Sequence, residues 1–430
     1  MDYARGVRGD GDFNEEVIVQ YRHESQTDEA ATEGSSQLSR RVFLGAGAAV
    51  AAAGATFGLA GPAFANTAKV GKLGAESTFG PVTIAEAGGR GSYARAVRLT
   101  AGRPAGQSTS ILATYQGGAG PGFPLYRSDD NGRTWTKQGS VPNPEDAAGF
   151  ALQPFLYELP RAFAGFPKGT LLFSCNVFGA DSTKIQLYAS TDAGINWQFL
   201  STVATGGRAN TTNGATPVWE PFLLLHNDNL ICYYSDQRDP NFGQKLAHQT
   251  STDLHNWGPV VDDATGPAYA DRPGMTSVAQ LKGDLWIMTY EFGLPDDPAN
   301  PDQDNYSYLV HYRLAKDPES FRFSEDIPLV DQNGHAPNGA PIVSWSQSGG
   351  VNGTIVVTGN DDQDFFINRD LGDPGKWTLL SSPMPAGYSR QTIPLDGPGS
   401  PENRGLVFVI AGAQYGESAP VTAGIISLGD

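Results

Sequence analysis

Cysteine is scarce in this sequence, and its scarcity limits the kinds of site that the chain can form. Only two cysteines, Cys175 and Cys232, occur in 430 residues. Without a C-x-x-C pair or a histidine cluster, the sequence gives no sign of a zinc site. Both cysteines stand in apolar runs, which favours buried free thiols, although the sequence alone leaves a disulfide open. We predict no bound metal and no cofactor.

Charge is also sparse, and basic residues are the rarer kind. Charged residues make up 17% of the chain, and its formal net charge is −17. Nucleic-acid binding is disfavoured, because it depends on Lys and Arg that displace counterions from phosphate. Acidic residues at 296–297 and 302–304 could bind calcium, but they lack the EF-hand order, so we interpret them as solvated loop residues.

Residues 1–65 do not resemble a folded domain. A twin-arginine motif, Arg40-Arg41, precedes an Ala/Gly-rich apolar run that ends in the small-x-small sequence Ala63-Phe64-Ala65. A membrane anchor is the alternative, but the run is short and only weakly hydrophobic. We therefore predict a cleaved twin-arginine signal, a secreted protein and no membrane association of the mature chain.

A turn motif recurs along the rest of the chain. In Ser190–Trp197, Asp192 can bond its own backbone, Gly194 supplies a positive φ, and Trp197 packs onto the sheet that the turn closes. Similar turns end in three further tryptophans. Trp197 follows Trp135 by 62 residues, and Trp257 follows Trp197 by 60. Trp377 follows Trp257 by 120 residues, which is two periods. A fixed period indicates a repeat architecture.

Each period contains apolar runs typical of buried strands. The plainest run occurs six times, at residues 110–115, 170–175, 229–234, 285–290, 354–358 and 406–410. The last period ends before a fourth strand, and residues 81–85 belong to no period. We predict an all-β, six-bladed β-propeller formed by residues 66–430 as one domain, with the N-terminal strand closing the last blade.

Two glutamates stand out at one rim of this propeller. The starts of first strands and the ends of second strands share that rim, and Glu220 and Glu291 lie there in neighbouring blades, each between aromatic residues. Apolar surroundings raise a carboxyl pKa, and such a pair serves glycoside hydrolysis, with retention or inversion depending on its separation. Alternatively, each glutamate pairs with a rim arginine.

The turns resemble the Asp-boxes of sialidases and related propellers, which mark a fold and also occur in non-enzymes. Trp219–Phe222, followed 71 residues later by Tyr290–Phe292, resembles the catalytic pair of glycoside hydrolase family 93, the exo-α-1,5-L-arabinanases. The resemblance covers most of residues 75–430. It implies release of arabinobiose from the non-reducing end of linear arabinan with retention, with Glu220 as nucleophile and Glu291 as acid/base.

Two other functions stay open at this point. An exo-α-sialidase needs three arginines for its carboxylated sugar, and Arg95, Arg272 and Arg390 could supply them, with Tyr290 or Tyr388 as nucleophile. The opening motif of sialidases is matched only imperfectly around Arg95. A glycan-binding propeller without catalysis is the second alternative, because rim aromatics would stack on sugars in either case.

The remaining candidates are substrate-binding residues of this rim. Asp236 could instead form a local ion pair with Arg238, and His335 could merely cap a turn. We expect an oligosaccharide or polysaccharide as the partner, and a monomer. The candidates are Tyr93, Arg95, Trp219, Asp236, Arg272, Tyr290, His335, Asn338 and Arg390.

Overall fold

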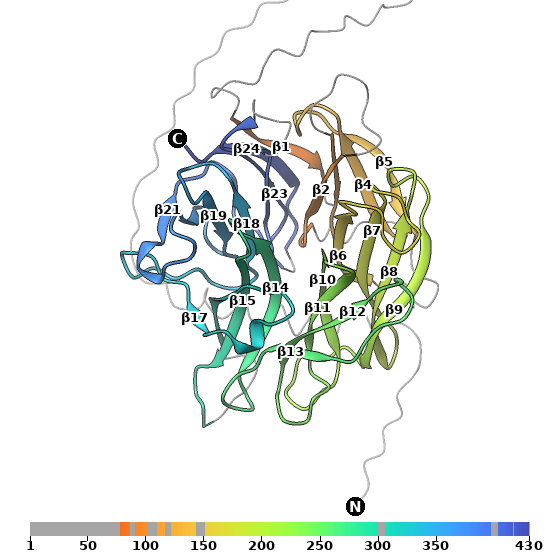
Figure 1. Cartoon of the computed structure of the whole chain (residues 1–430), viewed down its shortest axis with the longest axis vertical. Coiled ribbons are helices and arrows are strands. Elements are labelled where there is room, and N and C mark those ends of the chain that lie inside the picture. Colours follow the sequence, from red (N-terminus) through yellow and green to blue (C-terminus); the bar gives the residue numbers. More distant parts are fainter. Residues whose placement is uncertain are drawn as a thin grey trace, which may run out of the picture.

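A computed structural model describes residues 78–86, 91–100, 110–116, 122–142, 151–299, 306–396, 403–415 and 417–429. Six four-stranded antiparallel sheets surround a central axis (Figure 1). The predicted six-bladed propeller is therefore confirmed. Residues 1–65 lie outside the described residues, so the predicted signal segment stays a prediction. Within the described ranges, no helix is long and apolar enough to cross a membrane.

The first three blades follow the chain in order from the inner strand to the outer strand. They comprise β2 (Arg95–Leu99), β3 (Ser110–Thr114), β4 (Phe123–Ser128) and β5 (Thr136–Val141); β6 (Ala151–Glu158), β7 (Leu171–Phe178), β8 (Ser182–Ser190) and β9 (Gln198–Gly207); and β10 (Val218–His226), β11 (Asn229–Asp236), β12 (Lys245–Ser251) and β13 (Val261–Ala264).

The last three blades repeat this arrangement, and two 3-10 helices, Phe321–Phe323 and Pro374–Lys376, lie in their loops. The strands are β14 (Arg272–Gln280), β15 (Trp286–Pro295), β16 (Tyr306–Ala315) and β17 (Ile327–Pro328); β18 (Ile342–Ser346), β19 (Thr354–Thr358), β20 (Phe365–Asn368) and β21 (Thr378–Leu380); and β22 (Gln391–Pro394), β23 (Leu406–Ala411), β24 (Val421–Ser427) and β1 (Phe79–Ala85).

The sixth blade joins the two ends of the propeller. Strand β1 pairs antiparallel with β24, with Thr83 opposite Thr422, and the two strands lie side by side in Figure 1. This pairing confirms the predicted closure by the N-terminal strand. Closure covers edge groups of the last blade that would otherwise stay unpaired.

The core lies between neighbouring blades. Every residue of β7 and β19 is buried, as expected for strands covered on both faces. Cys175 and Cys232 pack in two of these cores as free thiols, which confirms the prediction, and burial raises the pKa of both. Neither thiol is suited to chemistry, because the thiolate is the reactive form.

The recurring turn has the predicted bonding. The Asp192 carboxylate accepts from the Asn196 N–H at 2.9 Å, and the Trp197 indole N–H donates to the Gly194 carbonyl at 3.1 Å. Gly194 has φ +89°, and a Cβ there would lie 3.0 Å from Leu112 of the preceding blade. The turn joins a third strand to a fourth, so the antiparallel topology places it at the opposite end of the blade from the rim with the two glutamates.

Candidate active site

Glu220 and Glu291 line the same cavity, of about 430 Å³, at one end of the propeller. Glu220 belongs to β10 in the third blade and Glu291 to β15 in the fourth. The predicted meeting of two glutamates from neighbouring blades at one rim is thus found. The other lining residues are Gln153, Thr211, Trp219, Gln244, Arg272, Tyr306, Tyr308, Asn338, Gly339, Asn360, Asp361, Tyr388, Gln414, Tyr415 and Glu417.

A backbone feature that recurs in all six blades presents Glu220 to the cavity. One residue at the start of each inner strand has a positive φ, between 46° and 62°, which is uncommon for a residue other than glycine. In three blades this residue coincides with a register shift between the first and second strands. The six residues are Tyr93, Gln153, Glu220, Met275, Ala340 and Ser389.

Hydroxyl and amide donors surround the Glu220 carboxylate. Tyr93 donates to its Oε1 and Ser235 to its Oε2, each at 2.9 Å, and the Gln153 amide lies 3.4 Å from Oε1. Burial raises the pKa of Glu220, while hydrogen bonds from Tyr93, Ser235 and the Met275 backbone, and the charge of Arg272, act in the opposite direction. Tyr93 therefore contacts the carboxylate, and it lies in a smaller chamber beside the main cavity.

Glu291 is held differently, by backbone of the next blade. Its Oε2 accepts from the Ala340 N–H at 2.8 Å. A Cβ at Gly274, its partner across the strand pair, would lie 3.3 Å from Glu291 Oε1 and 2.7 Å from the Gln244 amide. Glycine at 274 therefore leaves the space that the Glu291 carboxylate occupies.

On the other face of β15, Tyr290 packs in the core between the third and fourth blades, and its polar contacts lie within blade four. The Tyr290 hydroxyl donates to Asp326 at 2.5 Å, and His311 contacts the same carboxylate oxygen at 2.9 Å. Tyr290 is fully buried, so the expectation that it binds substrate, or acts as a nucleophile, is not supported. Its side chain instead holds the strand that carries Glu291.

The Arg272 guanidinium, which lines the cavity, is held by neutral side chains. It donates to Asn213 at 2.8 Å, Gln237 at 3.1 Å and Gln244 at 2.8 Å. Gln237 also accepts from the Trp219 indole at 2.7 Å. One glutamine therefore orients both a cation and an aromatic ring of the wall, and the predicted positions of Trp219 and Arg272 at the site are as expected.

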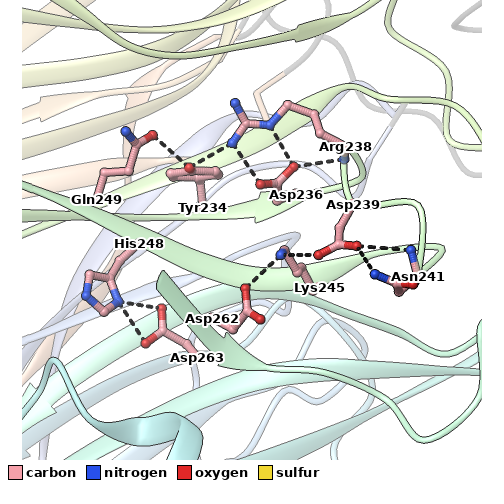
Figure 2. A network of polar contacts seen from close by, with 10 residues as sticks. All are labelled: Tyr234, Asp236, Arg238, Asp239, Asn241, Lys245, His248, Gln249, Asp262 and Asp263. Carbon is pink, nitrogen blue, oxygen red and sulfur yellow. Dashed lines mark hydrogen bonds and ion pairs between the residues drawn. The ribbon is translucent and has the colours of Figure 1, made fainter. Parts of the chain in front are cut away.

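An ion-pair network secures the loop that carries Gln237 and Gln244 (Figure 2). The Arg238 guanidinium donates to both carboxylate oxygens of Asp236 at 2.8 Å. The Lys245 ammonium pairs with the carboxylates of Asp239 and Asp262, each at 2.7 Å. Asp236 is buried in this pair and is not among the residues that line the cavity. The expectation that Asp236 binds substrate is therefore not supported, and the alternative, a local ion pair with Arg238, is found.

The other two arginines do not join Arg272. Arg390 is fully buried and donates to backbone carbonyls, including those of Asp362 and Gln363 at 2.9 Å. Arg95 donates to the carbonyl and hydroxyl oxygens of Ser389 at 2.6 Å, and burial lowers its pKa to about 10. Neither lines the cavity, so the arginine triad expected of a sialidase does not assemble.

Blade five contributes one of the two predicted polar residues. Asn338 lines the cavity and donates to Asp361 at 2.8 Å. His335 pairs with Asp362 at 2.6 Å, stacks on Phe366 and is not a lining residue. Its expected contact with substrate is therefore not supported.

Several lining residues were not predicted as binding residues. Tyr306 and Tyr308 stack at 5.9 Å on one wall, and Tyr388 and Tyr415 meet edge to face at 5.2 Å on another. Tyr306 and Tyr308 lie in β16, and Tyr415 follows β23. Tyr388 is the rim aromatic and alternative nucleophile of the sialidase hypothesis, whereas Tyr306, Tyr308 and Tyr415 were not predicted. Aromatic residues recur in many strands, so composition alone could not select these three.

A six-bladed propeller with two carboxylates from adjacent blades in one cavity has the architecture of propeller glycoside hydrolases. A scan against protein-family models and a search of curated proteins each found no match. Solved structures do match. The GH93 α-L-arabinofuranosidase of Fusarium graminearum, solved with arabinobiose, is 37% identical, with 82% of this chain and 98% of that chain covered and a TM-score of 0.74.

An α-L-arabinanase of Penicillium chrysogenum, also solved with arabinobiose, is 38% identical, with 82% of this chain and 99% of that chain covered and a TM-score of 0.75. The chain belongs to glycoside hydrolase family 93, and the protein is a glycoside hydrolase. The NanB sialidase of Streptococcus pneumoniae, 10% identical with a TM-score of 0.53, shares the fold alone.

Proposed function

We propose that this protein is a retaining exo-hydrolase that releases arabinobiose from the non-reducing end of linear α-1,5-L-arabinan. The observation that carries the proposal is that Glu220 and Glu291 line one cavity. The two family members solved with arabinobiose support the substrate class. The cavity volume of about 430 Å³ falls in the range of small-molecule pockets, which favours the end of a glycan chain as ligand.

The chemistry follows a double displacement. Glu220 attacks the anomeric carbon and forms a glycosyl ester, while Glu291 gives its proton to the departing glycosidic oxygen. Glu291 then takes a proton from water, the water oxygen attacks the anomeric carbon, and the Glu220 ester bond breaks. Both carboxyl groups return to their starting states, and two inversions give net retention.

The surroundings of Glu220 favour the nucleophile role for this residue. Donors from Tyr93 and Ser235 stabilise Glu220 as an anion, which a nucleophile must be. The acid/base role of Glu291 rests on the resemblance of Tyr290–Phe292 to the catalytic pair of the family.

Product analysis tests the proposal. Linear arabinan should yield arabinobiose as the first product, in the retained anomeric form when followed by NMR in the first minutes. Oligosaccharides blocked at the non-reducing end should resist hydrolysis, whereas those labelled at the reducing end should be cleaved. An early ladder of mixed products, or the inverted anomer, would refute the exo or retaining assignment, and activity confined to a sialyl conjugate would refute the substrate.

We also propose that residues 1–65 direct export through the twin-arginine pathway and are then removed. The Arg40-Arg41 motif and the Ala63–Ala65 sequence support this proposal. Replacing both arginines by lysine should leave the precursor inside a twin-arginine-competent bacterial host, whereas the unchanged precursor should be exported and shortened. Equal export of both forms would refute it.

A further inference from the structure

A second, much smaller chamber adjoins the cavity at Gln153 and Glu220, which line both. Its volume is about 20 Å³. One water needs roughly 10–15 Å³ of such space and two to four polar partners. The chamber therefore has room for one water-sized molecule and no more.

Two buried polar atoms of residues that line this chamber lack a partner. Arg95 Nε and Thr276 Oγ1 have no hydrogen-bond partner among the described residues. Both residues are buried, since Arg95 is only 6% and Thr276 only 5% exposed. Both Arg95 terminal nitrogens donate elsewhere, to oxygens of Ala94 and Ser389. Leaving such groups unpaired is costly, so the Arg95 Nε–H calls for an acceptor and the Thr276 hydroxyl for an acceptor or a donor.

The charges around the chamber select the kind of molecule. The Glu220 carboxylate disfavours an anion, and the Arg95 guanidinium disfavours a cation. No group of three or more His, Cys, Asp or Glu that could hold a metal occurs in the described part of the chain. A neutral molecule of one heavy atom, able to donate and accept, fits these limits.

We propose that this chamber binds a single structural water, held by Arg95 and Thr276, which supports the Glu220 carboxylate from behind the substrate cavity. Arg95 and Glu220 line the same small chamber, and the attraction between their charges favours the carboxylate form. The water fixes Arg95 in that place. In this role Arg95 and Thr276 are positioning residues. The proposal extends the proposed function, because it concerns the state of the same nucleophile.

A crystal structure of the full chain tests the binding site without reference to activity. We expect one ordered solvent peak within hydrogen-bond distance of Arg95 Nε and Thr276 Oγ1. It should be absent in Thr276→Val. It should persist in Thr114→Val, which removes another buried threonine hydroxyl that lacks a partner and does not line the chamber. No peak, or an anomalous peak after a bromide soak, would overturn the proposal.

Kinetics on linear arabinan test the support of Glu220. The acidic limb of kcat/KM should move to higher pH in Thr276→Val, by about half a pH unit, because the carboxylate loses support. In Thr114→Val the acidic limb should lie at the same pH as in the unchanged protein. If the acidic limb of Thr276→Val does not move, the role assigned to the water is wrong. If the unchanged protein does not hydrolyse arabinan, the proposed function is refuted, but the crystallographic test of the water still holds.

Discussion

Blades three and four each supply one glutamate, and the two side chains are held in contrasting ways. The backbone N–H of Glu220 is bound by Gln153 Oε1 at 3.0 Å, so its carboxylate is not needed to hold its own strand. Glu291 Oε2 accepts the Ala340 N–H at 2.8 Å and thereby holds the next blade. Hydroxyls of Tyr93 and Ser235 bind the Glu220 carboxylate beside the Met275 backbone N–H, whereas the Glu291 carboxylate binds the Ala340 backbone N–H.

Other blades explain why Glu291 has this second task. Gln116, at the end of the second strand in blade one, accepts the Gln153 N–H at 3.0 Å, and Ser235 in blade three accepts the Met275 N–H at 3.2 Å. Glu291 stands at the corresponding place in blade four. The carboxyl that we propose as acid/base thus occupies a position at which other blades use a neutral acceptor.

The largest expected effect separates the two roles. Glu220→Ala should lose activity on every substrate. Glu291→Ala should lose about 10²–10⁴-fold on arabinan, the usual contribution of general acid–base catalysis, but much less on an aryl arabinoside, whose leaving group needs little protonation. Initial rates with and without azide measure this, because azide should restore turnover only in Glu291→Ala. If azide instead restores turnover in Glu220→Ala, and the product has the same anomeric form as the substrate, then Glu220 is the acid/base and Glu291 the nucleophile.

The next largest effect concerns the donors around Glu220. Tyr93→Phe removes a hydrogen bond that lowers the pKa of Glu220, so that pKa should rise further. The nucleophile must be ionised, so kcat/KM should fall by about tenfold near the acidic limb, and the limb should move to higher pH. Tyr312→Phe, which removes a hydroxyl bonded to Gly372 far from the cavity, is the control. Equal pH profiles of the two variants would contradict this account.

A smaller effect is expected from Gln237, which orients Trp219 and Arg272 on the cavity wall. Gln237→Ala leaves the Trp219 indole and one Arg272 donor without their acceptor. We expect KM for arabinan to rise about tenfold, equivalent to about 1.4 kcal/mol, with kcat nearly constant. Gln138→Ala, at the opposite end of the blades, should leave both constants unchanged. A fall in kcat with unchanged KM would place Gln237 in the chemistry instead.

The last expected effect is on stability and not on activity, and it distinguishes the two glutamates directly. Glu291→Ala leaves the buried Ala340 N–H without its acceptor and should lower the free energy of unfolding by about 1–3 kcal/mol, whereas Glu291→Gln keeps an acceptor.

Burial raises the pKa of Glu220, so its ionisation destabilises the fold as pH rises through the raised pKa. Glu220→Gln should remove that loss, and urea unfolding at pH 5 and pH 8 measures both effects. Equal losses in Glu291→Ala and Glu291→Gln would contradict the structural role.

Sequence reasoning reached the two glutamates because strand ends repeat with the blade period. It failed for Arg95 and Arg390, which have the same periodic positions at the rim but point their guanidinium groups into buried backbone carbonyls. Position along a strand predicts which rim a residue occupies. It does not predict whether the side chain turns to the cavity or into the gap between blades.

The sequence by itself determined the number of blades, the closing strand and the rim shared by Glu220 and Glu291. Each of these depends on a period and on alternation within strands, which are local properties of the chain. Only the tertiary structure decided which side chains surround the glutamates. Tyr93 reaches Glu220 across 127 residues, through a backbone turn of positive φ in each blade, and no local pattern encodes that contact.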